Sequence, residues 1–228
     1  MMEVVLIRHG MTNGNLEKRY IGGRTDEPLC TTGRERLCHH SYPEVDAVIV
    51  SPMLRCIETA SLIYPDYRVI EEEKFRECDF GAFEGFTAKE LEQDPRYQEW
   101  INSMGTAAFP GGEDPEKFQQ RCRTGFLEVL EFSRRLGFYK VAIICHGGTI
   151  MSVMSSFSKP KKDYFDFQVK NGEGYVLSVD QNTFNSSHTR ISYRSDHWRS
   201  SESVSSDSTD GEDNCRVGTN FKKLFSED

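Results

Sequence analysis

Short apolar runs that end in polar or turn-forming residues recur along the chain. Runs of this kind are typical of strands that are buried on both faces of a sheet. They predict strands over residues 3–8, 46–50 and 141–145, a short strand at 69–70, and two further strands over 174–179 and 189–193.

Apolar residues at helical spacing predict what lies between these strands. The clearest helix covers residues 115–136 and stops at Gly137, because glycine readily adopts the left-handed conformation that ends a helix. We assign the apolar stripe of this helix to the core. It consists of Phe118, Cys122, Phe126, Val129, Leu130 and Phe132.

Four shorter helices are expected, over residues 31–40, from residue 51 onward, over 88–93 and over 147–157. Thr31 or Thr32 can cap the first of them. Pro52 lies near the first helical position of the second, where its missing N–H costs little. The rest of residues 75–110 shows no clear periodicity.

The alternation of strands and helices predicts an α/β fold, a three-layer α/β/α sandwich with a mostly parallel central sheet. Near residue 195 the composition changes to serine and acidic residues with few apolar ones. We therefore expect a folded domain over residues 1–195. Residues 196–228 should form an acidic, Ser-rich tail that is disordered, because it can bury too little apolar surface to fold.

Composition and charge narrow the class of protein. The formal net charge of −8 over 228 residues argues against a protein that coats nucleic acid. No apolar run approaches the roughly 20 residues that span a bilayer, so we expect a cytoplasmic protein without membrane association. Seven scattered cysteines without a C-x-x-C pair favour reduced thiols over disulfides or a zinc site. The oligomeric state stays open, with a homodimer as one option.

Candidate chemistry lies where three of the predicted strands end. Arg8 and His9 close the first strand, Arg55 follows the second, and His146 closes the strand at 141–145. In an open parallel sheet, ligands bind outside the carboxyl ends of the strands, so these side chains can converge on one pocket. Two arginines and two histidines in one pocket repel one another unless an anion such as phosphate binds between them.

Five segments, in this order, make the chain similar to the histidine phosphatase superfamily, which includes phosphoglycerate mutases and many small phosphatases. The segments are Arg8-His-Gly-Met-Thr-Asn-Gly-Asn15, Arg19–Leu29 with Thr32-Gly33, Ser51-Pro-Met-Leu-Arg55, Phe75-Arg-Glu77 with Phe80–Gly85, and Cys145-His146-Gly147. Within the superfamily, the segment Arg19–Leu29 looks most similar to that of α-ribazole phosphatases and their relatives.

The resemblance implies a metal-independent phosphatase that needs no cofactor. His9 would attack phosphorus and become phosphohistidine. Arg8, Arg55 and His146 would stabilise the transferring phosphoryl group. Asn15 and Gly147 would complete the phosphate-binding set.

A general acid/base is also required, and two carboxylates are candidates. Glu77 and Glu84 both lie in the fourth matching segment, and physical reasoning alone does not separate them. The resemblance implies that Glu77 is the acid/base and that Glu84 has a supporting role.

Several functions remain open at this point. The expected one is hydrolysis of a small phosphorylated metabolite, a phosphomonoester. A phosphoglycerate mutase is the alternative, although between Gly85 and Phe109 the chain offers only Lys89 and Arg96 as bases. A catalytically inactive phosphate-binding or scaffold protein is disfavoured because no reactive residue is replaced. A metal-dependent hydrolase is disfavoured because the metal-ligand spacings of known motifs are absent.

Overall fold

The computed structural model describes residues 1–180, 189 and 191–196 and contains a six-stranded sheet in the order β3-β2-β4-β1-β5-β6. The pairs β1/β4, β2/β4 and β2/β3 are parallel, whereas β5 is antiparallel to both β1 and β6. The mostly parallel sheet is therefore confirmed. The strands are β1 (Met2–Arg8), β2 (Ala47–Val50), β3 (Val69–Glu71), β4 (Lys140–Cys145), β5 (Gly174–Val179) and β6 (Ile191–Asp196).

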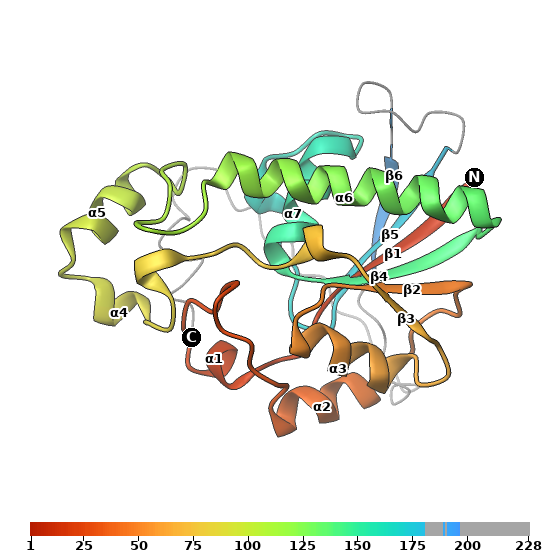
Figure 1. The fold of residues 1–228 in the computed structure, drawn as a ribbon, viewed down its shortest axis with the longest axis horizontal. Coiled ribbons are helices and arrows are strands. Elements are labelled where there is room, and N and C mark those ends of the chain that lie inside the picture. Colours follow the sequence, from red (N-terminus) through yellow and green to blue (C-terminus); the bar gives the residue numbers. More distant parts are fainter. Residues whose placement is uncertain (181–188, 190, 197–228) are drawn as a thin grey trace, which may run out of the picture.

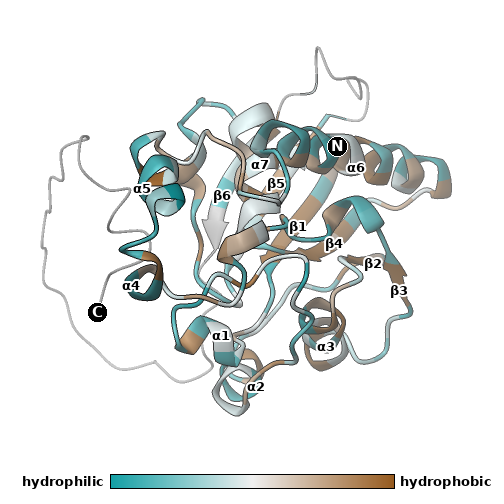
Figure 2. Cartoon of the chain, turned by 60° about the vertical axis from the view of Figure 1, so that its left-hand side comes forward, coloured by the Kyte–Doolittle hydropathy of each residue, from teal (hydrophilic) through white to brown (hydrophobic). Residues whose placement is uncertain are grey.

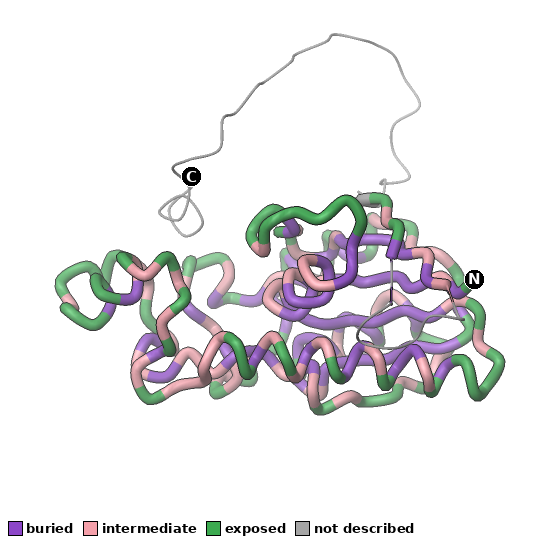
Figure 3. The backbone as a smooth tube through the Cα atoms, turned by 90° about the horizontal axis from the view of Figure 1, so that it is seen from above, coloured by how far each residue is buried: buried purple, intermediate pink, exposed green. Residues whose placement is uncertain are grey.

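Helices cover both faces of this sheet, so the molecule has the predicted three layers (Figure 1). Helices α2 (Thr31–Cys38) and α3 (Leu54–Ile63) pack together on one face. Helices α6 (Pro115–Leu136) and α7 (Gly147–Phe157) pack on the other. Strand side chains alternate between the two resulting cores: Val4 and Leu6 join the α6/α7 side, and Val5 and Ile7 the α3 side. Strands β1, β2, β4 and β5 are accordingly the most continuously buried part of the described chain, whereas β3, at one edge of the sheet, is partly exposed (Figure 3).

A separate lobe follows the carboxyl ends of the strands, over the stretch in which the sequence showed little pattern. It contains α4 (Ala88–Leu91), α5 (Pro95–Asn102) and the 3-10 turn η2 (Gly81–Phe83), whereas the 3-10 turn η1 (Glu73–Phe75) packs against α6 beside the main core. In Figure 2, α4 and α5 lie apart from the sheet and are mainly hydrophilic outside. Their few apolar residues join a small aromatic core that includes Tyr20, Phe83, Tyr97, Trp100 and Phe109. The remaining short elements are α1 (Asn13–Leu16) and η3 (Tyr164–Phe167).

Some local expectations are wrong. Helix α2 is capped by Cys30, whose Sγ accepts from the Gly33 N–H, and not by either threonine. Helix α3 begins at Leu54, and Met53 is its N-cap. Pro52 therefore lies before the helix and not at its first position. Phe132 is 40% exposed and does not belong to the core stripe, since α6 turns this position away from the sheet.

The last strand, the tail, the absence of membrane helices and the cysteines can be compared with the described residues. The last strand is β6, which begins two residues later than predicted. The predicted tail, apart from Asp196, lies outside the described residues. Within the described part of the chain, no helix is long and apolar enough to cross a membrane. The six cysteines in that part are free.

Candidate active site

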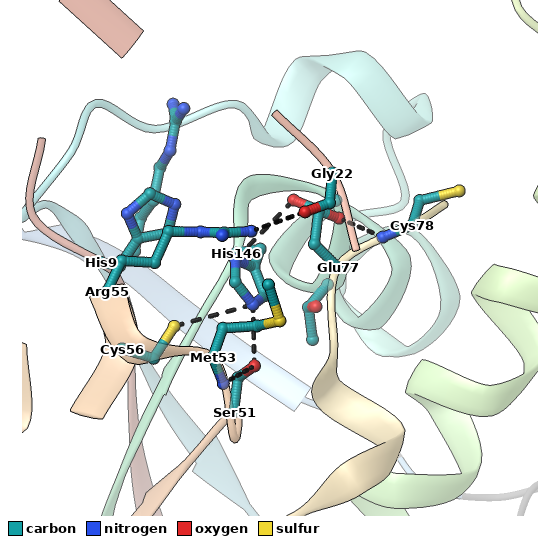
Figure 4. A network of polar contacts seen from close by, with 12 residues as sticks. His9, Gly22, Ser51, Met53, Arg55, Cys56, Glu77, Cys78 and His146 are labelled. Atoms are coloured by element: carbon teal, nitrogen blue, oxygen red, sulfur yellow. Dashed lines mark hydrogen bonds and ion pairs between the residues drawn. The ribbon is translucent and has the colours of Figure 1, made fainter. Parts of the chain in front are cut away.

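The carboxyl ends of β1, β2 and β4 bring the predicted reactive residues together. His9 follows β1 directly, Arg55 lies in the first turn of α3 after β2, and His146 is the N-cap of α7 after β4. The two imidazole ring centroids are 5.2 Å apart. Figure 4 shows both histidines, Arg55 and Glu77 facing one another in this network.

A backbone carbonyl fixes the tautomer of His9. Its Nδ1 lies 2.7 Å from the Gly10 carbonyl oxygen, which can only accept, so Nδ1 carries the proton and Nε2 keeps its lone pair. Burial lowers the pKa of His9 well below its ordinary value, and the charges of Arg55 and Arg8 lower it further. His9 is therefore a neutral imidazole whose Nε2 lone pair is available to react with an electrophile.

The two arginines are held by carbonyl oxygens and not by carboxylates. Arg55, which is 1% exposed, donates from Nη1 to the Thr25 carbonyl at 3.0 Å and from Nη2 to the Gly22 carbonyl at 3.3 Å. Arg8 Nη1 donates to the Val169 carbonyl at 2.8 Å. Among the described residues, Arg8 Nε is a buried nitrogen without a hydrogen-bond partner. In the part of the chain that the structure describes, no carboxylate forms an ion pair with either guanidinium, although Glu77 lies near both, so the two charges can attract an oxyanion.

His146 turns one nitrogen toward the protein and the other toward the site. Its Nε2 lies 2.8 Å from Ser51 Oγ and 3.7 Å from Cys56 Sγ. Burial, followed by the charge of Arg55, lowers the pKa of His146 well below its ordinary value, so the ring is neutral. Ser51 Oγ accepts from the Met53 N–H and is free to donate its own proton to Nε2. In the tautomer in which Ser51 donates to Nε2, the ring proton is on Nδ1 and can be donated to a ligand.

We expect Ser51→Ala to lower the free energy of unfolding by about 1–3 kcal/mol, because it deprives a buried imidazole nitrogen of its closest partner. Urea denaturation measures this difference. Ser61→Ala, on the helix that follows Ser51, is the matched control, since Ser61 is exposed and donates only to the Ile57 carbonyl. It should change the stability by less than about 0.5 kcal/mol. Equal losses in both variants would contradict a special role of Ser51.

Glu77 lies at the edge of the histidine pair as a buried carboxylic acid. Its Oε2 is 3.9 Å from His146 Nδ1, and its Oε1 accepts from the Cys78 N–H at 2.9 Å. Burial raises the pKa of Glu77, and this effect exceeds the opposing ones of the Cys78 N–H and the nearby arginines. A carboxyl group with a raised pKa can both donate and accept a proton near neutral pH.

Arg121, which the sequence analysis did not single out, fixes the backbone under Glu77. Its guanidinium donates to the carbonyl oxygens of Lys74, Arg76 and Glu77 at 2.6–3.1 Å and pairs with Glu113 at 2.7 Å. Its position on α6 between Phe118 and Cys122, two residues of the apolar stripe, is the signal that could have identified it.

The surroundings of Glu84 differ from those of Glu77. Its carboxylate accepts from the backbone N–H groups of Gly22 at 2.9 Å, Thr25 at 3.0 Å and Phe80 at 3.3 Å. The carbonyls of Gly22 and Thr25 in turn hold Arg55. Glu84 is therefore placed to position the loop that orients Arg55, and it does not line the pocket at the histidines.

A cavity of about 540 Å³ opens over this cluster. The sequence-predicted residues that line it are Arg8, His9, Asn15, Glu77 and Gly147, whereas Arg55, His146 and Glu84 are not among its described lining residues. The Oδ1 atom of Asn15 accepts from the Thr12 N–H and from Asn171 Nδ2. Asn15 can thus offer its amide N–H to a ligand.

Two more residues support the site without having been predicted. Thr59 Oγ1 accepts from the Gly10 N–H at 2.9 Å and donates to the Arg55 carbonyl at 2.6 Å, so it ties the two segments together. Its spacing of four residues from Arg55 on one helix could have indicated this contact. Asn171 Nδ2 donates to the His9 carbonyl at 3.1 Å, but it lies in a loop for which the sequence gives no signal. Within the described residues, no group of three His, Cys, Asp or Glu side chains is arranged to hold a metal ion.

The chain is similar in sequence to a known protein family and to several individual proteins. The family model described as the histidine phosphatase superfamily (branch 1) matches residues 4–192. An uncharacterized phosphatase, PhoE, of Bacillus subtilis (strain 168) is 31% identical over 165 residues, which are 69% of this chain and 78% of that protein. An adenosylcobalamin/alpha-ribazole phosphatase of Escherichia coli (strain K12) is 26% identical, over 79% of this chain and 91% of that protein.

Solved structures also resemble the chain. A putative alpha-ribazole-5′-P phosphatase from Escherichia coli superposes with a TM-score of 0.74 at 22% identity, over 90% of this chain and 99% of that one, and supports the fold alone. A protein described as a phosphoglycerate mutase, from Thermus thermophilus, has a TM-score of 0.60 at 31% identity, over 78% of this chain and 93% of that one.

Proposed function

The chain belongs to the histidine phosphatase superfamily, as a phosphoric monoester hydrolase, and we propose that it cleaves a small phosphomonoester through a covalent phosphohistidine on His9. One observation carries the proposal. The Gly10 carbonyl holds the proton of His9 on Nδ1, and the free Nε2 lies in a cluster with two arginines that form no ion pair with any described carboxylate. A phosphate dianion would complete the charge balance of this cluster.

In the first step, His9 Nε2 attacks phosphorus, a P–N bond forms, and the bond from phosphorus to the alcohol oxygen breaks. Arg8 and Arg55 would hold the phosphoryl oxygens, with His146 Nδ1–H and the Asn15 amide as neutral donors. Glu77, kept protonated by its raised pKa, would give its proton to the leaving alkoxide.

In the second step, water attacks the phosphohistidine and the P–N bond breaks. Glu77, now ionised, takes the proton from the attacking water, so both the carboxyl group and His9 return to their starting states. The arginines act in both steps because the same phosphoryl group stays between them. No metal ion enters this scheme, since fixed donors supply the charge stabilisation.

A phosphoglycerate mutase remains the alternative, because it would use the same phosphohistidine but return the phosphoryl group to a phosphoglycerate. The lobe over the site favours hydrolysis. Of its two bases, Arg96 is already bound to Asp94 at 2.6 Å, and Lys89 is not among the described residues that line the cavity. Neither is placed to bind a second anionic group of the substrate.

The first test is phosphate release from 4-nitrophenyl phosphate at pH 5–6 in excess EDTA. We expect turnover that the chelator leaves unchanged. Activity that EDTA removes and a divalent cation restores would contradict the metal-independent route. Little release into water, but rapid exchange of phosphate between phosphoglycerates, would instead establish the mutase.

A further inference from the structure

The part of the cavity beyond the phosphate-binding residues has walls of aromatic and thioether side chains. They come from the segment after α1, the α5 lobe, the start of α6, α7 and the 3-10 turn η3. The members are Tyr20, Phe80, Trp100, Met104, Phe109, Phe118, Met151, Tyr164 and Phe165. One of them, Met104, is 68% exposed at the protein surface. A bound group of suitable shape would cover this apolar surface.

In the same part of the cavity, the described lining residues offer no free positive charge. The described cationic residues that line the cavity are Arg8, at the phosphate end, and Arg19. Arg19 is occupied, because it binds Glu17 at 2.6 Å, Glu90 at 3.0 Å and the Gly85 carbonyl at 2.7 Å. The exposed Glu116 adds a negative charge to the wall.

We propose that the alcohol part of the substrate is a flat, ring-containing group that carries no negative charge. This inference rests on the proposed phosphatase function and names the substrate class of that same site. Aromatic walls bind flat rings through their faces and edges, and they also tolerate a positive charge over the ring face. A carboxylate or second phosphate would lose its hydration beside Glu116 without gaining a cation in return.

The test compares four esters at one pH. Benzyl and methyl phosphate have leaving alcohols of similar acidity and differ in the ring, whereas 4-carbamoylbenzyl and 4-carboxybenzyl phosphate have the same shape and differ in charge. We expect kcat/KM at least tenfold higher for benzyl than for methyl phosphate, and at least tenfold higher for the amide than for the carboxylate. Equal values within either pair, or a preference for the carboxylate, would overturn the inference.

Reversing the charge of Glu116 tests whether the preference for the uncharged ester arises from the cavity wall. Glu116→Lys should narrow the amide-to-carboxylate ratio at least threefold, while Glu44→Lys should leave it unchanged. Both glutamates are exposed, but Glu44 precedes β2, at the edge of the sheet opposite the site. If both variants changed the amide-to-carboxylate ratio equally, or if neither changed it, the wall would have no role in this preference.

A truncation tests the ring contact in the same way. Phe165→Ala should lower the benzyl-to-methyl ratio at least threefold. Phe132→Ala is the control, because Phe132 is similarly exposed on α6 but does not line the cavity. Turnover of all four esters without any preference would remove this inference and leave the phosphatase proposal intact. If no ester reacted and His9 took up no phosphate, the phosphatase proposal itself would fail.

Discussion

His9→Ala is expected to lower the rate of phosphate release from 4-nitrophenyl phosphate by about 10⁴-fold or more, because it removes the atom that forms the covalent bond. The imidazole is buried and fixed by one carbonyl, so no neighbouring group can replace it at the same place. His146, the nearest histidine, already uses its Nε2 for Ser51. Steady-state phosphate release measures the loss, and the unchanged fold is checked by thermal unfolding.

Label transfer gives the same prediction a second readout. Wild-type protein quenched during turnover of a ³²P-labelled ester should carry acid-labile, base-stable label, and His9→Ala should carry none. His39→Ala is the matched control, since His39 is exposed at the end of α2, and it should keep both label and rate. Full activity in His9→Ala would refute the phosphohistidine route.

The sequence predicted the part of the fold that positions the site because that part depends on local patterns. Residues 141–145 form an uninterrupted apolar run, and such a run must be buried on both faces of a sheet. His146 then follows at a strand end, where parallel strands bring distant residues to one edge. The same reasoning placed His9 and Arg55, so the clustering of these residues could be predicted before the distances between them were known.

The lobe over the site was less readable because long-range packing holds it together. Helix α5 has only two buried residues, Tyr97 and Trp100, and these face an aromatic core drawn from distant segments. These two residues and the partly buried Ile101 have helical spacing, but a stretch of eight residues is too short for this pattern to be distinctive. Its start could nonetheless have been predicted, since Asp94 caps the helix and Pro95 occupies its first turn.

The two acids show a further limit of sequence reasoning. Glu77 and Glu84 are seven residues apart in similar surroundings of aromatic and glycine residues. Only the three-dimensional contacts distinguish them: backbone N–H groups of a distant loop surround Glu84, whereas Glu77 approaches His146. The choice between them came from the family resemblance, and the geometry supplies a physical reason for it.

The last prediction concerns the proton that Glu77 would transfer. Because burial raises its pKa, the carboxyl group keeps its proton to a higher pH than an exposed glutamate does, and the protonated fraction falls as the pH rises through that pKa. Cleavage of benzyl phosphate, whose leaving alkoxide needs a proton, should therefore decline on the alkaline side. Glu77→Gln cannot transfer a proton, so it should lower kcat by about 10²–10³-fold and abolish this alkaline decline.

A substrate whose leaving group needs no proton distinguishes proton transfer by Glu77 from a purely structural role of this residue. 4-Nitrophenolate leaves without a proton, so Glu77→Gln should still form phosphohistidine on His9 from 4-nitrophenyl phosphate, and fail mainly in the second step, which needs a base. We expect a burst of nitrophenol equal to the protein concentration, followed by slow turnover. A variant that loses the burst as well, or keeps the wild-type pH profile for benzyl phosphate, would show that another group carries the proton.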